Sequence, residues 1–172
     1  MEKLILDFIA KFQNTFLDHM AIAFDLLGSK GAVFVIIGLA LMIDKRTRKM
    51  GIHVIISLIM CLVLGNLLLK PLIGRIRPYA RFNIPIIIEP YKDFSFPSGH
   101  TYSAFATAFS IKRYDEDLGV FMIFVSVLMA FTRMYLYVHY PTDILGGVAL
   151  GYVCAKMAEV TLQYVVKKRS EI

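Results

Sequence analysis

A series of long apolar stretches is the feature that most constrains how this chain can fold. Residues 51–69 carry no Asp, Glu, Lys or Arg, and residues 31–43, 118–136 and 142–166 are also predominantly apolar. Hydrophobic residues make up 58% of the chain and its mean hydropathy is +0.64, whereas a soluble domain is about 45–50% apolar. These stretches and the composition predict an all-α integral membrane protein.

Six stretches are interpreted as transmembrane helices. They are residues 15–28, 31–43, 51–69, 99–111, 118–136 and 142–166. A full span needs about 20 residues, so we expect the first two to be tilted, extended at their ends or shielded by neighbours. Residues 15–28 also contain Asp18, His19 and Asp25. Five spans are therefore the alternative, if this helix does not cross.

An amphipathic helix is predicted in front of the six-helix bundle. Residues 3–13 place apolar side chains at helical spacing, and charged side chains lie largely on the other side. Such a helix is expected to lie at the membrane interface. We interpret residues 1–172 as a single membrane-embedded domain whose motifs fall within residues 70–143.

Two basic segments predict the orientation in the membrane. The segment "DKRTRK" at 44–49 and the basic residues at 167–169 are both expected in the cytoplasm by the positive-inside rule. Both termini are then cytoplasmic, and the loops at 70–98 and 137–141 lie outside. The first of these loops nevertheless holds five Lys and Arg residues. Basic residues on the wrong side suggest a reason other than topology, such as an anionic substrate.

The charge and the cysteines argue against several other functions. The net charge is +6, but the basic residues cluster in short loops, where they set topology, and no nucleic-acid-binding motif is present. Cys61 and Cys154 both lie in apolar stretches and are expected to be buried thiols, with no disulfide or metal framework. The apolar N-terminal run is interrupted by charges, so no cleaved signal peptide is expected.

The first two polar motifs each have a structural and a chemical interpretation. Lys70 and Arg77 in "KPLIGRIRP" could simply extend to the membrane boundary, or they could form a cationic cradle for phosphate. Ser98, Gly99 and His100 in "PSGH" could form a turn and a helix cap. Alternatively, the free N–H groups of a helix start bind an anion, Gly99 permits close approach, and His100 protonates a leaving oxygen.

The third polar motif, "TRMYLYVHYPTD", contains Arg133, His139 and Asp143. Asp143 follows His139 by four residues, near the start of the last span. It could be a plain helix cap, or it could orient the ring of His139 and leave the other ring nitrogen as a nucleophile. All three motifs fall on one predicted side of the membrane. Together they fit phosphoryl transfer, which needs mainly positioning and charge stabilisation.

The pattern K-x6-R-P at 70–78, P-S-G-H at 97–100 and R-x5-H-x3-D at 133–143 resembles the three signature motifs of the type 2 phosphatidic acid phosphatase superfamily. This family includes membrane lipid phosphatases and soluble vanadium haloperoxidases. Order, spacing and helix context agree across the motifs. One departure is Thr132, where the family often has Ser before the arginine, but Thr keeps the hydroxyl group.

The resemblance implies a role for each motif residue. His139 would be the nucleophile that forms a phosphohistidine, Asp143 would orient it, and His100 would be the general acid. The phosphate oxygens would be held by Lys70, Arg77, Ser98, Gly99 and Arg133. No metal and no cofactor are expected, because the cationic side chains neutralise the phosphate.

The resemblance further implies a lipid phosphate or pyrophosphate phosphatase in a bacterial-type cytoplasmic membrane, with its site on the extracytoplasmic side. We favour undecaprenyl pyrophosphate as the substrate. Phosphatidylglycerol phosphate, phosphatidic acid and the 1-phosphate of lipid A are the alternatives, because the motifs contact phosphate rather than the leaving group. Membrane lipids are the expected partners, and no nucleic acid or obligate protein partner is expected. The loop at 79–93 is expected to contribute selectivity.

A transporter is the non-enzyme alternative. Asp18, His19 and Asp25 could mark an ion path inside the membrane. That function predicts charges spread through the depth of the bundle, whereas the motifs gather at one interface.

Overall fold

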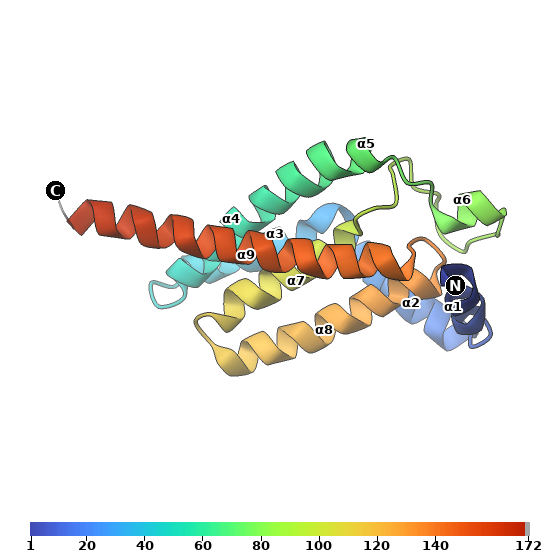
Figure 1. Cartoon of the computed structure of the whole chain (residues 1–172). Helices are drawn as coiled ribbons and strands as arrows, with labels where there is room; N and C mark the ends of the chain where they lie inside the picture. The colour runs from blue at the N-terminus through green and yellow to red at the C-terminus, as the bar shows by residue number, and fades with distance from the viewer. Residues whose placement is uncertain (171–172) are drawn as a thin grey trace.

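The computed structural model describes residues 1–170, and Figure 1 shows that they form a bundle of helices. Residues 171 and 172, which the predicted domain includes, lie outside the described residues. The α-helices are α1 (Glu2–Ala10), α2 (Thr15–Gly28), α3 (Ala32–Ile43), α4 (Arg48–Cys61), α5 (Lys70–Ile73), α6 (Pro78–Phe82), α7 (Gly99–Lys112), α8 (Glu116–Tyr135) and α9 (Pro141–Ser170). A π-helical segment, Leu62–Leu69, joins α4 to α5. The predicted all-α class is confirmed.

Short polar residues set the starts of the helices. The Asn14 side chain accepts a hydrogen bond from the Leu17 backbone N–H at 3.0 Å and caps α2. Asp115 caps α8 in the same way through the N–H of Leu118, at 2.9 Å. Such caps satisfy backbone donors that have no partner within the helix. The sequence therefore places breaks between helices where these residues occur.

Helix α7 lies at the centre of the bundle and packs against α4, α8 and α9. Nearly all of its side chains are buried, and many of them are Ala, Ser or Thr. Gly151 of α9 lets that helix approach closely, because a Cβ there would lie 2.8 Å from the Tyr102 carbonyl oxygen. Small residues at this contact bring α9 close to α7, as is typical of helix packing in membranes.

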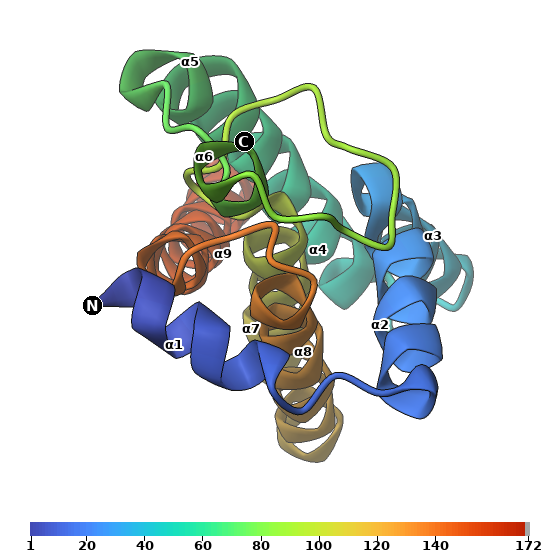
Figure 2. The ribbon, with the colours of Figure 1, turned by 90° about the vertical axis from the view of Figure 1, so that its right-hand side faces the viewer.

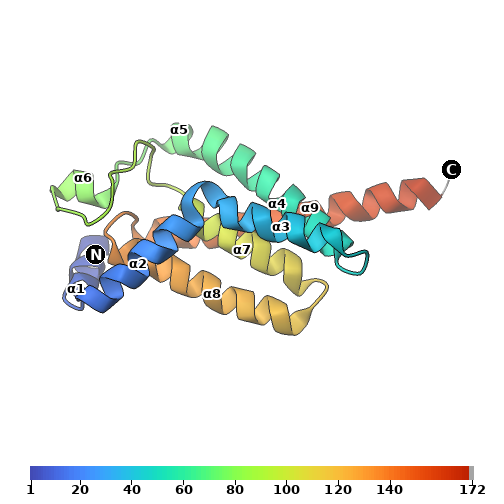
Figure 3. The same cartoon turned by 180° about the vertical axis from the view of Figure 1, so that it is seen from behind.

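The prediction of six transmembrane helices is not confirmed. Within the described residues, three helical segments are long and apolar enough to cross a membrane: Arg48–Phe82, Glu116–Tyr135 and Pro141–Val165. A fourth span results if α2 and α3 count together, since they form a pair bent by 58°. Figure 3 shows these two helices following one another along the back of the bundle. Helix α7 has only 14 residues, which at 1.5 Å per residue falls short of the roughly 30 Å of a hydrocarbon core.

The polar residues of α2 have partners inside the protein. Asp18 accepts a hydrogen bond from the Tyr135 hydroxyl at 2.6 Å, and Asp25 is ion-paired with Arg133. His19 is exposed and contacts the carbonyl oxygen of Thr15 through Nδ1. Asp18 and Asp25 therefore tether α2 to α8, which explains how a helix with two carboxylates stays in the bundle.

Helix α1 crosses one end of the bundle, as Figure 2 shows. Leu6 is buried among Tyr137 and Tyr140 of the turn before α9. Leu4 and Phe8 remain exposed on the other side. The helix is thus apolar on two faces: one packs on the protein, and the other is free to enter the membrane interface.

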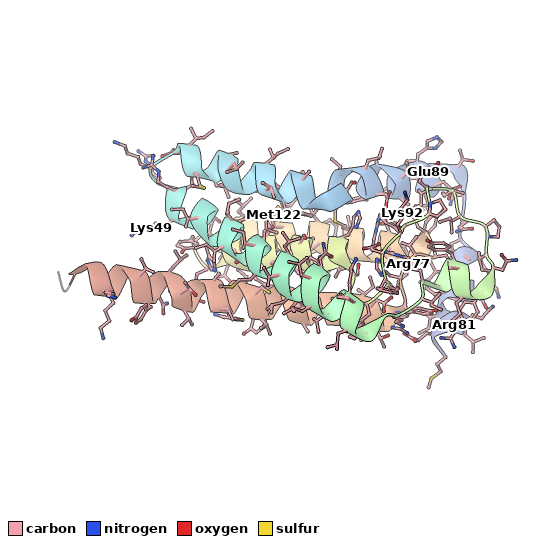
Figure 4. The ribbon with its side chains drawn as sticks, turned by 90° about the horizontal axis from the view of Figure 1, so that it is seen from above. Lys49, Arg77, Arg81, Glu89, Lys92 and Met122 are labelled. Carbon is pink, nitrogen blue, oxygen red and sulfur yellow. The ribbon has the colours of Figure 1, made fainter. Side chains whose placement is uncertain are left out.

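Charged residues lie at both ends of the molecule, and its sides are apolar. Figure 4 shows Lys49, in the basic segment after α3, at the end opposite Arg77, Arg81, Glu89 and Lys92. Between the ends, the outer faces carry exposed apolar side chains such as those of Leu39, Leu67, Phe121, Phe124 and Val160. An apolar outside around a partly polar inside is what a membrane-embedded bundle requires.

Candidate active site

The three motifs meet at the end of the bundle that carries α1 and α6. Lys70 begins α5, Arg77 precedes α6, Gly99 and His100 begin α7, and His139 lies in the turn between α8 and α9. These five residues line one cavity of about 650 Å³. Residues up to 69 positions apart therefore lie together, because α5, α7 and α9 all begin at the same end of the bundle.

His139 is held by groups on both ring nitrogens. Arg77 Nη1 lies 3.1 Å from His139 Nε2, while Asp143 Oδ2 lies 3.4 Å from His139 Nδ1. A guanidinium can only donate, so Nε2 must accept and the ring proton must reside on Nδ1, facing the carboxylate. Burial and the nearby Arg77 lower the pKa of His139 to about 3. At neutral pH the ring is therefore uncharged and Nε2 keeps its lone pair.

Asp143 acts both as a helix cap and as the partner of His139. Its Oδ2 accepts a hydrogen bond from the Tyr140 backbone N–H at 2.8 Å, in the first turn of α9. Ser95 Oγ donates to the same oxygen at 2.5 Å, and Arg75 Nη1 contacts the other oxygen at 2.5 Å. The carboxylate is fully buried. Since a buried charge must be paired, these contacts keep Asp143 ionised in one fixed position.

The predicted cationic cradle is occupied by a carboxylate of this chain. Asp93, in the loop between α6 and α7, forms ion pairs with Lys70 and with Arg77, the latter at 2.7 Å. The Arg77 Nε also donates to the Asp93 carbonyl oxygen at 3.0 Å. Burial alone raises the pKa of Asp93, but Lys70 and Arg77 outweigh it and hold this pKa at about 2. Asp93 is therefore an anion lying between the two cations.

The "PSGH" motif forms the start of α7, as predicted. Ser98 occupies the cap position, but its hydroxyl caps no backbone N–H and instead accepts from Thr101 Oγ1 at 2.9 Å. The Ser98 backbone N–H donates to the Asp143 carbonyl oxygen at 3.1 Å, which ties α7 to α9. A Cβ on Gly99 would lie 4.0 Å from Lys70 Nζ. This is an ordinary van der Waals distance, so position 99 borders the cradle and has room for a Cβ.

Arg133 is brought to the site but does not line the cavity. Its Nη1 pairs with Asp25 of α2, and its Nη2 donates to Thr132 Oγ1 at 2.9 Å. The hydroxyl at position 132 thus holds the arginine, which fits the substitution of Thr for the more usual Ser. Arg133 is completely buried, so its charge depends on Asp25 for compensation.

Four residues around the site were not predicted from the motifs. They are Arg75 and Ser95, which contact Asp143, Asp93, which pairs with the cradle, and Tyr91, which contacts Asp25. Arg75 lies two positions before Arg77, and the other three lie in the stretch that leads into "FPSGH". Their nearness in sequence to the motifs was the available signal. Within the described residues, no three His, Cys, Asp or Glu side chains form a cluster that could hold a metal ion.

A sequence model of the PAP2 superfamily matches residues 50–169, which include all three motifs. The chain belongs to the PAP2 superfamily. This confirms the resemblance seen in the motifs. The match begins within α4, so α1, α2 and α3 of this PAP2 protein lie outside the matched residues.

Several curated proteins are similar to this PAP2 chain. It is 34% identical over 113 residues to "Undecaprenyl-diphosphatase" of Sulfolobus acidocaldarius, covering 64% of this chain and 54% of that one. It is 30% identical over 126 residues to "Bacitracin transport permease protein BcrC" of Bacillus licheniformis, covering 71% and 62%. The chain therefore matches between about half and three fifths of the length of these relatives.

A solved structure shares the fold. The structure of Aquifex aeolicus LpxE superposes with a TM-score of 0.81 at 24% identity, covering 91% of this chain and 93% of that one. Structural similarity at this level of sequence identity supports only a shared arrangement of the helices. It agrees with the all-α bundle and with an integral membrane protein of several spans.

Proposed function

We propose that this protein is a metal-independent lipid phosphatase that hydrolyses a pyrophosphate or phosphomonoester lipid, with undecaprenyl pyrophosphate as its main substrate. The cavity is the observation that carries the proposal. It is lined by Lys70, Arg77, His100 and His139, and also by apolar side chains of α3, α4 and the π-helical segment. These are Val35, Ile55, Leu58, Ile59 and Leu62. A phosphate site that continues into an apolar wall suits a lipid whose headgroup is a phosphate.

The first step of the proposed reaction transfers the phosphoryl group to the protein. Nε2 of His139 attacks phosphorus and forms a P–N bond, while the P–O bond to the leaving group breaks. His100 gives a proton to the leaving oxygen. With a pyrophosphate lipid, the leaving group is the lipid monophosphate. The phosphate takes the place of Asp93 between Lys70 and Arg77, whose charges stabilise the transition state.

The second step releases inorganic phosphate. A water molecule attacks phosphorus and gives a proton to His100, while the P–N bond breaks and its electron pair returns to Nε2 of His139. Asp143 keeps Nδ1 of His139 protonated throughout, because its carboxylate faces that nitrogen. Ser98, Gly99 and Arg133 are proposed to contact the phosphate oxygens as well, for which Arg133 has to turn from Asp25.

The choice of undecaprenyl pyrophosphate is supported by the name of the Sulfolobus acidocaldarius relative, undecaprenyl-diphosphatase. Phosphatidylglycerol phosphate and lipid A phosphates are the substrates named by other relatives of similar identity. We place the site on the extracytoplasmic side, because the basic segment at 44–49 lies at the opposite end of the molecule. A transport function finds less support, since the carboxylates of α2 are paired with α8 rather than spread along a path.

Phosphate release in the presence of a chelator tests the proposal. Purified protein in detergent with EDTA is expected to release phosphate from undecaprenyl pyrophosphate at the rate seen without EDTA. Its kcat/KM should be highest for this lipid in a panel with phosphatidylglycerol phosphate, phosphatidic acid and lipid A. Strict dependence on Mg²⁺ would overturn the metal-independent mechanism. A higher kcat/KM for another lipid would overturn the substrate and leave the mechanism standing.

A further inference from the structure

Asp25 is a carboxylate of α2 that contacts three residues around the site. Its Oδ1 is paired with Arg133 Nη1, accepts a hydrogen bond from the Tyr91 hydroxyl, and lies 3.9 Å from His100 Nε2. The side chain is only 16% exposed. Asp25 lies outside the residues that the superfamily model matches. A largely buried carboxylate in an apolar helix requires a reason, and tethering α2 to α8 does not account for its nearness to His100.

The last turns of α2 form a seat for the His100 ring. The backbone carbonyl oxygen of Asp25 lies 3.1 Å from His100 Nε2. One turn later, a Cβ on Gly28 would lie 2.2 Å from His100 Cδ2, which no real side chain tolerates. The ring therefore packs directly on the backbone of α2, and its position is fixed by Asp25 on one side and by Gly28 on the other.

This seat decides which nitrogen of His100 can exchange a proton. A carbonyl oxygen only accepts, so Nε2 carries its hydrogen whether the ring is neutral or charged. The proton that the ring gives or takes must then be on Nδ1, which has no hydrogen-bond partner in the part of the chain that the structure describes. His100 also lines the cavity. The geometry leaves Nδ1 as the atom available to a leaving group.

The charges around His100 show what the carboxylate adds. The groups that face the ring are Asp25 from α2, Arg133 from α8, and Arg77 and Tyr91 from the segments around α6. Two of these are cations, and they repel a protonated ring. Asp25 is the carboxylate that compensates both Arg133 and the protonated ring. Burial and Arg133 lower the pKa of His100 to about 4, and Asp25 opposes this shift. A general acid must hold its proton when the substrate is bound, so the carboxylate favours the reactive form.

We propose that Asp25 is a positioning residue for general-acid catalysis, which holds the His100 ring through Nε2 and favours its protonated form, so that Nδ1 delivers the proton to the leaving oxygen. This inference rests on the proposed phosphatase function. It predicts that the importance of Asp25 depends on how much the leaving group needs a proton. An alkoxide needs one far more than a phosphate monoester does, since the latter is a weak base with a pKa of about 6.

The test compares two lipids with the same chain, farnesyl phosphate and farnesyl pyrophosphate, by initial rates of phosphate release. For Asp25→Asn we expect kcat on farnesyl phosphate to fall about 100-fold, and kcat on farnesyl pyrophosphate to fall less than about tenfold. KM should change little for either lipid. In the His100→Ala background, Asp25→Asn should cause no further loss on farnesyl phosphate.

Two further variants are a second test, which remains valid if Asp25→Asn does not fold, and a matched control. Gly28→Ala changes no charge but displaces the His100 ring, so it should give the same preferential loss on farnesyl phosphate. Asp18→Asn is the matched control, because Asp18 is a carboxylate of the same helix that contacts Tyr135 instead of His100. It should lower both rates equally, if at all.

Equal losses on both lipids in Asp25→Asn and Gly28→Ala would overturn the inference, and would mean that Asp25 acts through Arg133 or the packing of α2. Unchanged activity in both variants would overturn it as well. If the wild-type protein hydrolysed neither lipid, the proposed function itself would fail, and the inference with it. The two failures are thus distinguished by the wild-type rates.

Discussion

His139→Ala is expected to lower kcat by about 10⁴-fold or more, because it removes the atom that attacks phosphorus. Nε2 of His139 is the nitrogen that faces Arg77 in the cavity, with its lone pair free of a proton. No neighbouring histidine can take over, since His100 is fixed on α2 by its Nε2. The measurement is phosphate release from undecaprenyl pyrophosphate in detergent, at saturating substrate.

His19→Ala is the control for this prediction. His19 is an exposed histidine of α2, and within the described residues the hydrogen-bond contact of its ring is to Thr15 of the same helix. We expect this variant to keep full activity. Thermal unfolding in detergent should show that His139→Ala keeps the wild-type fold. Activity within about tenfold of wild type in a folded His139→Ala protein would exclude His139 as the nucleophile.

Arg77→Ala is expected to lower kcat/KM by about 10³-fold. The guanidinium has three roles at once: it is half of the phosphate cradle, it donates to His139 Nε2, and it donates to the Val138 carbonyl oxygen at 3.1 Å. Its loss removes charge stabilisation from the transition state and also loosens the turn that carries the nucleophile. Steady-state kinetics with undecaprenyl pyrophosphate measure the effect.

Two variants separate charge from geometry at this position. Arg77→Lys keeps the charge but loses the planar fork, so a loss of about tenfold or more is expected to remain. Arg81→Ala removes an exposed arginine of α6, four residues along the chain, and should leave kcat/KM within about twofold of wild type. Equal effects of Arg77→Ala and Arg81→Ala would show that only the general positive charge of this end matters.

The three motifs could be found in the sequence because their residues have fixed spacing and lie at helix ends. The structure places Lys70, Arg77, Gly99, His100 and His139 around one cavity, as their chemistry suggested. Each lies at a helix start or in a turn, where helix-breaking residues such as Pro78, Pro97 and Pro141 mark the position in the sequence. Local signals of this kind do not depend on how the helices pack.

The partners of these residues could not be predicted, because they depend on packing between distant segments. Asp25 meets Arg133 across a separation of 108 residues, and Arg75 meets Asp143 across 68. From the sequence alone, Asp25 is an unfavourable charge in an apolar helix. Only the approach of α2 to α8 turns it into a partner for a buried cation.

The predicted number of six spans is not confirmed, and the reason is physical. Hydropathy records how apolar a stretch is, and it does not record whether lipid or protein surrounds the stretch. Helix α7 is surrounded by α4, α8 and α9, so most of its side chains contact protein. Helices α2 and α3 meet at a bend of 58°, near Gly28 and Gly31. Hydropathy alone counts the residues on the two sides of this bend as two separate spans.

Trapping of the phosphorylated protein tests whether His139 forms a phosphohistidine. Protein is mixed with undecaprenyl pyrophosphate carrying ³²P in its terminal phosphate and is quenched in alkali at short times, because a phosphohistidine survives alkali and is destroyed by acid. We expect the label on the peptide that contains His139, and no label on this peptide in His139→Ala. Wild-type turnover with no label on this peptide at any quench time would exclude a phosphohistidine at this residue.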